Sequence, residues 1–387
     1  MGNQLAASTL AATGADWVTV QTNVGESGQG ISVIEKGGTG NAFASTIYEV
    51  GALEKLAAGQ GKTYGVGAIF LTHGETDADN MDYGAHVAKL ATDYDTDLRA
   101  LTGQAQKIPF FASQQGTFPQ ALGPSSSTLA VWQLQGALPD YYLVGPKYQY
   151  EYAADLVHLT APSYRRLGEK YAEAYFEVTA AGHDWRPLAP TSAKLDGTVI
   201  TVDFQVTFPP LAWEETVPLP HQAAWPQWAA GRGFEVADST GALAITSVEL
   251  SGNQVKITLD APPTGTDLTA ASALFQDAQG FHGGDPFGRR GQLRDSDPFT
   301  GYSAREIECN VTAGSAVVTA ATPGGFADRG RTELATAAGL PGGATVMAIA
   351  GDTITLDRAW EGATGKAPIK LRNDHRNYAV QFALAVQ

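Results

Sequence analysis

Up to about residue 186, short apolar runs alternate with longer segments that have helical spacing. Four apolar or β-branched runs predict strands, and they are Asp16–Thr22, Val66–Thr72, Ile108–Ser113 and Tyr141–Gly145. Three segments with apolar residues three and four apart predict helices, and they are Asn41–Ala58, Met81–Leu101 and Ser163–Val178. Strands that alternate with helices indicate a parallel sheet covered on both faces, so residues 1–186 are expected to form a three-layer α/β/α domain.

From about Pro187 the pattern changes to strict alternation of apolar and polar residues between Gly, Asn and Asp turns. The sequence "SVELSGNQVKITL" contains two alternating strands around a turn, which is a hairpin signal. We therefore expect an all-β domain, most simply a sandwich, over residues 187–304. The last alternating run, Tyr378–Val386, is expected to return to it, so residues 370–387 are assigned to the same domain.

A third unit is expected inside the β domain, over residues 305–369. It is a series of short strands rich in Gly, Ala and Thr, beginning "VTAGSAVVTAATPGGF". It resembles small β modules of phage tail and other surface proteins. The fold class expected for the chain is thus α/β, followed by an all-β sandwich with a small β insert.

Composition narrows the function classes. Acidic residues outnumber basic ones 40 to 25, giving a net charge of −15, which disfavours binding to nucleic acid or an anionic membrane. The single cysteine, Cys309, cannot form an internal disulfide. The chain contains no run of about 18 apolar residues, and we do not expect its first residues, as they stand, to act as a signal peptide. The compartment stays open: extracellular or periplasmic if the true start lies upstream, and otherwise cytoplasmic.

Asp155 and His158 lie between the last predicted strand of the α/β domain and its closing helix. An imidazole can accept a proton from a hydroxyl nucleophile, and a carboxylate on its other nitrogen fixes the tautomer. On spacing alone, an Asp and a His three residues apart are more often surface residues or a helix cap. Their position beyond the carboxyl end of a predicted parallel strand favours a functional site.

Metal binding is the alternative use of the polar residues in this half of the chain. His73, Asp77 and His86 could be imagined as ligands, but the sequence has neither the HExxH nor the CxxC spacing of common metal sites. We expect no metal and no cofactor.

Three sequence blocks resemble the SGNH hydrolases, also called GDSL-type esterases. The segment "DLVHLTAPSYRRLGEKYA" resembles the block that supplies the acid and base of the triad. The segments "FLTHGETDADNMDYGAHVAKL" and "TNVGESGQGISVIEKGG" resemble two further blocks of the branch containing sialate O-acetylesterase-like carbohydrate esterases. The resemblance covers roughly residues 16–180 and implies ester hydrolysis on an acylated carbohydrate.

The resemblance also implies roles for individual residues. His158 would be the base and Asp155 its acid, and the backbone N–H of Gly28 would donate to the oxyanion. His73, Gly74 and Glu75 would form the block near the oxyanion or substrate, with His73 standing where the family usually has Gln. The alternative for His73 and Glu75 is a polar strand end that hydrogen-bonds to neighbouring loops.

The nucleophile is the main departure from the family. The family's Ser follows the first, central strand, but only fifteen residues precede "DWVTVQT", and the one serine among them, Ser8, lies in a predicted helix. Three explanations stay open. The chain is a fragment whose start lies upstream, a second chain or missing segment supplies the first strand, or Ser27 is the nucleophile of a rearranged site. Ser27 lies in Gly-x-Ser-Gly on a turn, although its neighbours match the oxyanion block.

Two functions are therefore compatible with the sequence. The first is a serine ester hydrolase that works through an acyl-enzyme, most simply a carbohydrate O-acetylesterase. The second is a catalytically impaired protein of the same scaffold that binds carbohydrate or serves on a surface or phage tail. They differ in whether a Ser hydroxyl can reach His158.

Overall fold

The structure is a computed structural model of the 387-residue chain. It describes residues 12–14, 19–116, 125–217, 219–220, 225–275, 289–297, 305–327, 329, 333–372 and 374–387. Ser8 and the beginning of the strand predicted at Asp16–Thr22 lie outside these residues.

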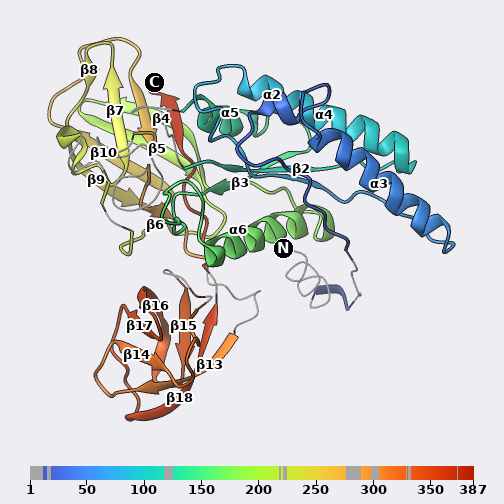
Figure 1. Ribbon diagram of the computed structural model, residues 1–387. Coiled ribbons are helices and arrows are strands. Elements are labelled where there is room, and N and C mark those ends of the chain that lie inside the picture. Colours follow the sequence, from blue (N-terminus) through green and yellow to red (C-terminus); the bar gives the residue numbers. More distant parts are fainter. Residues whose placement is uncertain are drawn as a thin grey trace.

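The N-terminal domain has three layers. Its sheet contains β1 (Ile69–Leu71), β2 (Phe110–Gln114) and β3 (Tyr141–Pro146), which are parallel and adjacent in that order. One face is covered by α2 (Ile31–Ile34), α3 (Ala42–Ala58), α4 (Tyr83–Thr102) and α5 (Ser126–Leu134). The other face is covered by α6 (Ala161–Tyr175), which continues as a short π-helix over Phe176–Ala180 (Figure 1).

Side-chain alternation along the strands explains why both faces of the sheet are covered. Ile69 and Leu71 pack into the cluster shared with α3 and α4. Phe70 points to the other face, where its ring stacks on Phe111 at 5.4 Å and meets the edge of Tyr171 of α6 at 5.5 Å. Each strand is therefore covered on both faces, which accounts for its mainly apolar sequence.

The expected fourth parallel strand is absent from the described residues. Thr19–Thr22 lies in extended coil and pairs with no strand among them. The alternation in "WVTVQT" predicts a strand locally, but a strand exists only when a neighbour accepts its backbone hydrogen bonds. In the described part of the sheet, β1 pairs with β2 alone and is an edge strand.

The second domain is a β-sandwich. One of its sheets has the order β4 (Ala189–Asp196), β5 (Val199–Gln205), β10 (Gln254–Leu259) and β9 (Ile245–Ser251). The other has the order β19 (Phe382–Ala385), β11 (Thr269–Ser272), β7 (Phe234–Asp238) and β8 (Gly241–Ala242). A small third sheet pairs β6 (Ala212–Trp213) with β12 (Leu293–Arg294), and a 3₁₀ turn covers Pro226–Trp228. Strands β9 and β10 form the hairpin that "SGN" predicted.

The α/β domain and the sandwich share one hydrophobic core, which includes Val131 of α5 and Phe382 of β19. Polar contacts join them as well. The Gln114 side chain donates to the carbonyl of Gln381 at 2.7 Å and accepts from its N–H at 2.7 Å. Because both side chains are fully buried, this pair fixes the end of β2 against the last segment of the chain.

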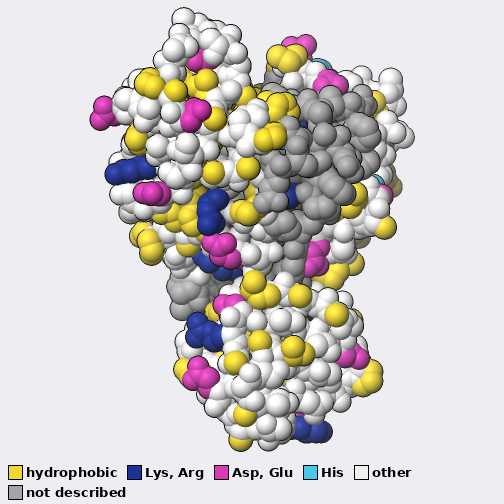
Figure 2. Space-filling view, turned by 90° about the vertical axis from the view of Figure 1, so that its left-hand side faces the viewer, with side chains coloured by type: hydrophobic (Ala, Val, Ile, Leu, Met, Phe, Trp, Pro, Cys, Tyr) yellow, Lys and Arg dark blue, Asp and Glu magenta, His cyan; other side chains and the backbone are white. Residues whose placement is uncertain are grey.

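The strands between residues 305 and 372 form a closed barrel with a core of its own. The barrel has the order β13 (Arg305–Val311), β14 (Val317–Ala320), β17 (Thr353–Leu356), β16 (Leu340–Ala350), β15 (Leu334–Ala337) and β18 (Gly365–Arg372). Figure 2 shows it as a separate lobe below the rest of the molecule. The barrel contacts the α/β domain through an ion pair: Arg165 Nη2, on α6, lies 3.9 Å from Oε1 of Glu333, the residue before β15.

The fold class predicted from the sequence, α/β followed by an all-β part, is confirmed by these sheets. Within the described ranges, none of the helices is long and apolar enough to cross a bilayer.

Candidate active site

Five of the residues singled out in the sequence follow the carboxyl ends of the parallel strands. His73, Gly74 and Glu75 come directly after β1, and the Asp155–His158 segment lies between β3 and α6. Ser27 and Gly28 lie in the loop before α2. Because parallel strands all run the same way, their carboxyl ends lie together at one end of the sheet, and a ligand site is expected there.

Asp155 and His158 lie in a closed loop at the tip of a short antiparallel pairing between Tyr152 and Leu159. The N–H of Ala153 donates to the carbonyl of His158 at 2.7 Å, which closes the loop. Leu156 has a φ of +57°, so the chain turns sharply between the acid and the base. The turn brings the side chains of Asp155 and His158, which are three residues apart in the sequence, into contact.

The pair has the geometry of an acid–base dyad. The two amide N–H groups of Val157 and His158 donate to Asp155 Oδ1, each at 3.0 Å. The other oxygen, Oδ2, accepts from His158 Nδ1 at 2.7 Å. The hydrogen bonds from the Val157 amide, the imidazole and the His158 amide lower the pKa of Asp155 to about 2, so the carboxylate is ionised at neutral pH.

An ionised carboxylate on Nδ1 keeps the proton on that nitrogen and leaves Nε2 with a free lone pair. The side chains of His158 and Asp155 are 58% and 52% exposed. In the described part of the chain, His158 Nε2 has no hydrogen-bond partner. The dyad is therefore oriented to accept a proton from a group in the solvent-facing space.

The loop that contains Ser27 is attached to the N-terminus of α3. Glu26 Oε1 accepts the N–H groups of Asn41 and Ala42, the latter at 2.9 Å. A carboxylate at this position satisfies free helix N–H groups and complements the helix dipole. Ser27 is exposed, and its hydroxyl has no hydrogen-bond partner among the described residues. Gly28 has a φ of +72°, a conformation that favours glycine at this turn.

His73 holds the same loop from the sheet side. Its Nε2 lies 2.8 Å from the carbonyl oxygen of Gln29, which can only accept, so Nε2 carries the proton. Its Nδ1 then accepts from the hydroxyl of Tyr83 at 2.9 Å, and the two rings stack. Thr76 donates to the carbonyl of Gly28 at 3.2 Å. The imidazole N–H of His73 is thus directed at the backbone of the loop.

Asp77 completes this attachment. It is 8% exposed, and its Oδ2 accepts the N–H of Ile31 at 2.7 Å, at the start of α2. The "HGETD" block therefore hydrogen-bonds to three residues of this segment: His73 to Gln29, Thr76 to Gly28, and Asp77 to Ile31. These contacts fix the backbone next to Ser27.

Gly74 and Glu75 connect the block to its other neighbours. Gly74 has a φ of +120°, and its carbonyl accepts from the hydroxyl of Ser127 at 2.7 Å. Glu75 forms an ion pair with Lys147, whose side chain is 5% exposed. Burial acts to raise the pKa of Glu75, but the charge of Lys147 and its hydrogen bond outweigh it, so the pKa is lowered.

The structure thus attaches the backbone of Gly28 and Gln29, next to Ser27, to the block that contains His73, Gly74 and Glu75, and it forms the Asp155–His158 dyad separately. No hydrogen bond joins Ser27 to His158 within the described ranges. Sequence reasoning missed Tyr83, Ser127 and Lys147, which support the block. Of these three residues, Lys147 alone could have been found from the sequence, because it follows a predicted strand closely, as the other candidate residues do.

The residues considered as metal ligands are used otherwise. His86 Nδ1 pairs with Glu35 at 2.9 Å, apart from His73 and Asp77. His73 Nε2 and Asp77 Oδ2 are 3.9 Å apart, and each has its own backbone partner. Among the residues that the structure describes, no group of three His, Cys, Asp or Glu side chains could hold a metal ion.

The α/β domain thus has a parallel sheet between helices, an Asp–His dyad before the last helix and a glycine-containing loop at the carboxyl ends of the strands. Residues 18–177 match the model of a family described as carbohydrate esterase, sialic acid-specific acetylesterase. The resemblance seen in the sequence is therefore confirmed: over these residues the chain is similar to that family of carbohydrate esterases.

Other comparisons are weaker. The crystal structure of a carbohydrate acetylesterase from Xanthomonas citri resembles the chain with a TM-score of 0.39 and 17% identity. The match covers 54% of this chain and 45% of that one, so it spans less than half of that protein. A likeness of this size does not bear on function. No curated protein matches the chain.

Proposed function

We propose that this protein is a carbohydrate O-acetylesterase that works through an acyl-enzyme, with His158 as base, Asp155 as its orienting acid and Ser27 as nucleophile. The substrate is an acetylated carbohydrate. The observation that carries the proposal is the Nδ1–Oδ2 hydrogen bond of 2.7 Å in an exposed dyad. The family match over the same domain supports ester hydrolysis.

The reaction uses the groups at the carboxyl edge of the sheet. His158 Nε2 takes the proton of the Ser27 hydroxyl while its oxygen attacks the acetyl carbon. The backbone N–H of Gly28 donates to the oxyanion that forms. The ester C–O bond then breaks, the imidazolium returns its proton to the departing sugar hydroxyl, and water hydrolyses the acetyl-enzyme by the same base.

His73 has a positioning role in this scheme. Its N–H is directed at the Gln29 carbonyl, so we assign it to holding the loop and not to the oxyanion. We assign Gly74 and Glu75 to the same positioning role. The Gly74 carbonyl accepts from the Ser127 hydroxyl, and Glu75 pairs with Lys147. A loop held from several sides keeps the Gly28 amide in one orientation, which an oxyanion donor requires.

The second candidate function is a catalytically impaired carbohydrate-binding protein. It is favoured by one observation, which is that the hydroxyl of Ser27 does not contact His158 in the described part of the structure. In that case a nucleophile would come from a second chain or a further segment, or would be lacking. The two candidates differ in whether this chain alone releases acetate.

The test measures acetate release from an acetylated sugar and hydrolysis of p-nitrophenyl acetate by wild type, Ser27→Ala and His158→Ala. Ser32→Ala is the matched control for the serine, since Ser32 is exposed in the adjoining helix α2. His183→Ala is the control for the base, because His183 Nδ1 also pairs with a carboxylate, Glu177, at 2.6 Å.

We expect both site variants to lose activity and both controls to keep it. Loss in His158→Ala alone would assign the base but contradict Ser27 as nucleophile. An inactive wild type would contradict the esterase and favour the binding protein.

A further inference from the structure

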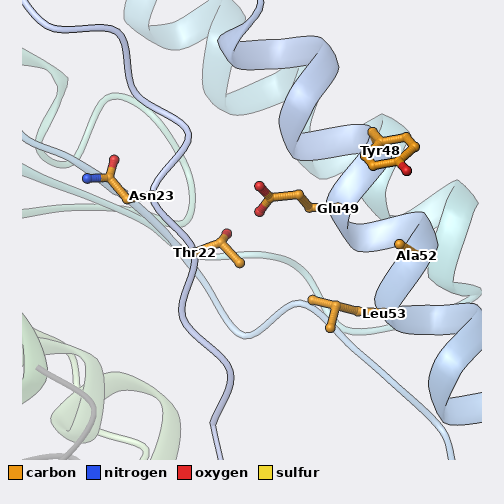
Figure 3. Close-up of a pocket in the computed structure, with 6 residues that line it drawn as sticks. All are labelled: Thr22, Asn23, Tyr48, Glu49, Ala52 and Leu53. Carbon is orange, nitrogen blue, oxygen red and sulfur yellow. The ribbon is translucent and has the colours of Figure 1, made fainter.

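The dyad lies at the surface of the protein. Figure 3 shows a cavity of about 420 Å³ between α3 and the extended segment before α2, and its walls contain none of the candidate site residues. The walls are formed by Thr22, Asn23, Tyr48, Glu49, Ala52 and Leu53. The Asp155 and His158 side chains are instead more than half exposed. Because solvent surrounds so much of each side chain, the geometry of the dyad depends on how its loop is held.

The dyad loop begins and ends in a short antiparallel stem. The N–H of Thr160 donates to the carbonyl of Glu151 at 3.0 Å, at the base of this stem. Two paired strands are marginally stable by themselves, and these are very short. The stem therefore needs an attachment to the rest of the domain if Asp155 is to stay in contact with His158.

One buried hydroxyl contacts both strands of the stem, and it belongs to Ser163 in the first turn of α6. Its oxygen accepts the N–H of Glu151 at 3.0 Å and the hydroxyl of Thr160 at 3.0 Å. Ser163 is fully buried, so water does not compete for these hydrogen bonds. The residues at the base of the loop, one before the dyad and one after it, are thus attached to the same atom.

Helix capping explains only half of this arrangement. Thr160 is the N-cap residue of α6, and its hydroxyl oxygen accepts the N–H of Ser163 at 3.4 Å, as capping residues commonly do. The contact to Glu151 has no part in capping, because Glu151 lies before the dyad, on the opposite strand of the stem. The Ser163 hydroxyl therefore links the start of the loop to the helix that follows the loop.

Arg166, nearly one turn further along α6, fixes the Ser163 hydroxyl. Its Nη2 donates to Ser163 Oγ at 3.3 Å, and its guanidinium lies over the ring of Tyr150, 5.7 Å from the centroid. Both Arg166 and Tyr150 are buried. A guanidinium can only donate, so the Ser163 oxygen acts as acceptor toward it, as it does toward Glu151. Buried groups thus set the orientation of the hydroxyl.

Helix α6 is a firm support because it is held on two sides. Leu167 and Tyr171 are buried in the hydrophobic cluster between α6 and the sheet. Lys170 donates to the carbonyl of His375 at 2.7 Å and to Oδ1 of Asn377 at 3.1 Å, in the segment that returns from the barrel. A side chain on such a helix holds a site more precisely than one on a loop.

We propose that Ser163 is a positioning residue for the dyad: its hydroxyl holds both ends of the dyad loop on α6, so that the Asp155 carboxylate stays in contact with His158 Nδ1. The effect of Ser163 on catalysis rests on the proposed function, since the dyad acts as a base in that reaction. Its effect on the geometry of the dyad does not rest on that function and can be measured without turnover.

The test compares two variants that each lose one hydroxyl. Ser163→Ala removes the attachment of the dyad loop, and Ser192→Ala is the matched control, because the Ser192 hydroxyl donates to Asp203 at 2.6 Å in the sandwich. NMR follows the titration of the Asp155 carboxyl carbon, and hydrogen exchange follows the Glu151 amide. Both readouts report on the dyad loop, whereas urea denaturation reports the general loss of stability in each variant.

In the wild type, the Glu151 amide should exchange slowly and Asp155 should titrate with a midpoint of about 2. In Ser163→Ala, the amide should exchange about tenfold faster or more, and the midpoint should rise above about 3, because the hydrogen bonds that lower this pKa form only in the closed loop. The kcat for acetate release should fall about tenfold or more at unchanged KM, since the base is affected and substrate binding is not. Ser192→Ala should behave as wild type in all three measurements.

The proposal is overturned if the Glu151 amide of the wild type exchanges like an unprotected amide, because the contact to Ser163 would then not exist in solution. It is also overturned if Ser163→Ala keeps the Asp155 midpoint near 2, if Ser192→Ala raises the midpoint equally, or if kcat is unchanged when the midpoint rises. A wild type that releases no acetate contradicts the proposed function, and the Asp155 midpoint then still decides whether Ser163 positions the dyad.

Discussion

Replacing Asp155 by Asn tests the dyad through a single atom. In the native loop, Oδ1 accepts two backbone N–H groups and Oδ2 accepts from His158 Nδ1. The introduced amide has only one acceptor oxygen. If that oxygen keeps the two N–H groups of the turn, the NH₂ group faces Nδ1, which must then act as acceptor. The imidazole proton moves to Nε2, the nitrogen that should receive the proton of the nucleophile.

The expected fall in kcat follows from losing the free lone pair on His158 Nε2, which would accept the proton of the nucleophile. A positioned general base contributes about 10²–10⁴-fold, so kcat of Asp155→Asn should fall by that factor. Folding should change little, because both side chains are more than half exposed and the turn keeps its amide bonds. A surface ion pair contributes about 0–1 kcal/mol, so Tm should fall by less than about 3 °C.

The assay measures kcat with an acetylated sugar, and Tm by calorimetry on the same samples. Glu177→Gln is the control, because it alters the carboxylate of the other exposed His–carboxylate pair, at His183. An Asp155→Asn variant that keeps kcat within about threefold of wild type would refute the reasoning, since His158 would then not depend on its acid.

Three further predictions concern the surroundings of the site. Glu75→Gln leaves Lys147 buried without its counter-charge, so the free energy of unfolding should drop by about 3 kcal/mol in urea denaturation; no change would mean that the pair is solvated. Gly74→Ala should lower the free energy of unfolding by about 2 kcal/mol or more, because the backbone there has a φ of +120° and an added Cβ would lie 3.3 Å from Ser127 Oγ. The control Gly103→Ala should lower it less, because an added Cβ at that residue, with a φ of +70°, meets open space. The Asp155 carboxyl carbon should titrate by NMR with a midpoint of about 2. Since this pKa is lowered, the contribution of the dyad to stability is complete above about pH 4 and is lost as the pH falls toward 2; a midpoint near 3.8 would contradict the hydrogen bonding described.

The sequence predicted most of the fold because its strands carry a strong local signal. Residues 108–112 are apolar and buried at every position, and such a run is typical of a strand covered on both faces. The strand predicted around Asp16–Thr22 was wrong over Thr19–Thr22, since alternation alone does not supply a pairing partner. Helix α5 was not predicted, because Ser125, Ser127 and Thr128 are buried polar residues whose hydrogen bonds form only in the fold.

The site was partly predictable for similar reasons. Asp155 and His158 are close in sequence, so one turn forms their hydrogen bond and spacing could indicate it. The pairing of Glu75 with Lys147 joins residues 72 positions apart, and nothing in the local pattern of either residue signals it. Likewise, Glu26 as a cap on α3 depends on how its loop folds back, which local propensity does not encode.

The central claim is that Ser27 is a nucleophile activated by His158. Labelling the protein with a fluorophosphonate, followed by peptide mass spectrometry, tests this most directly, because the reagent forms a stable adduct with an activated serine. The account predicts one adduct, on Ser27, which is lost in His158→Ala and retained in His183→Ala. A protein that stays unlabelled, or carries the adduct on another serine, would contradict it.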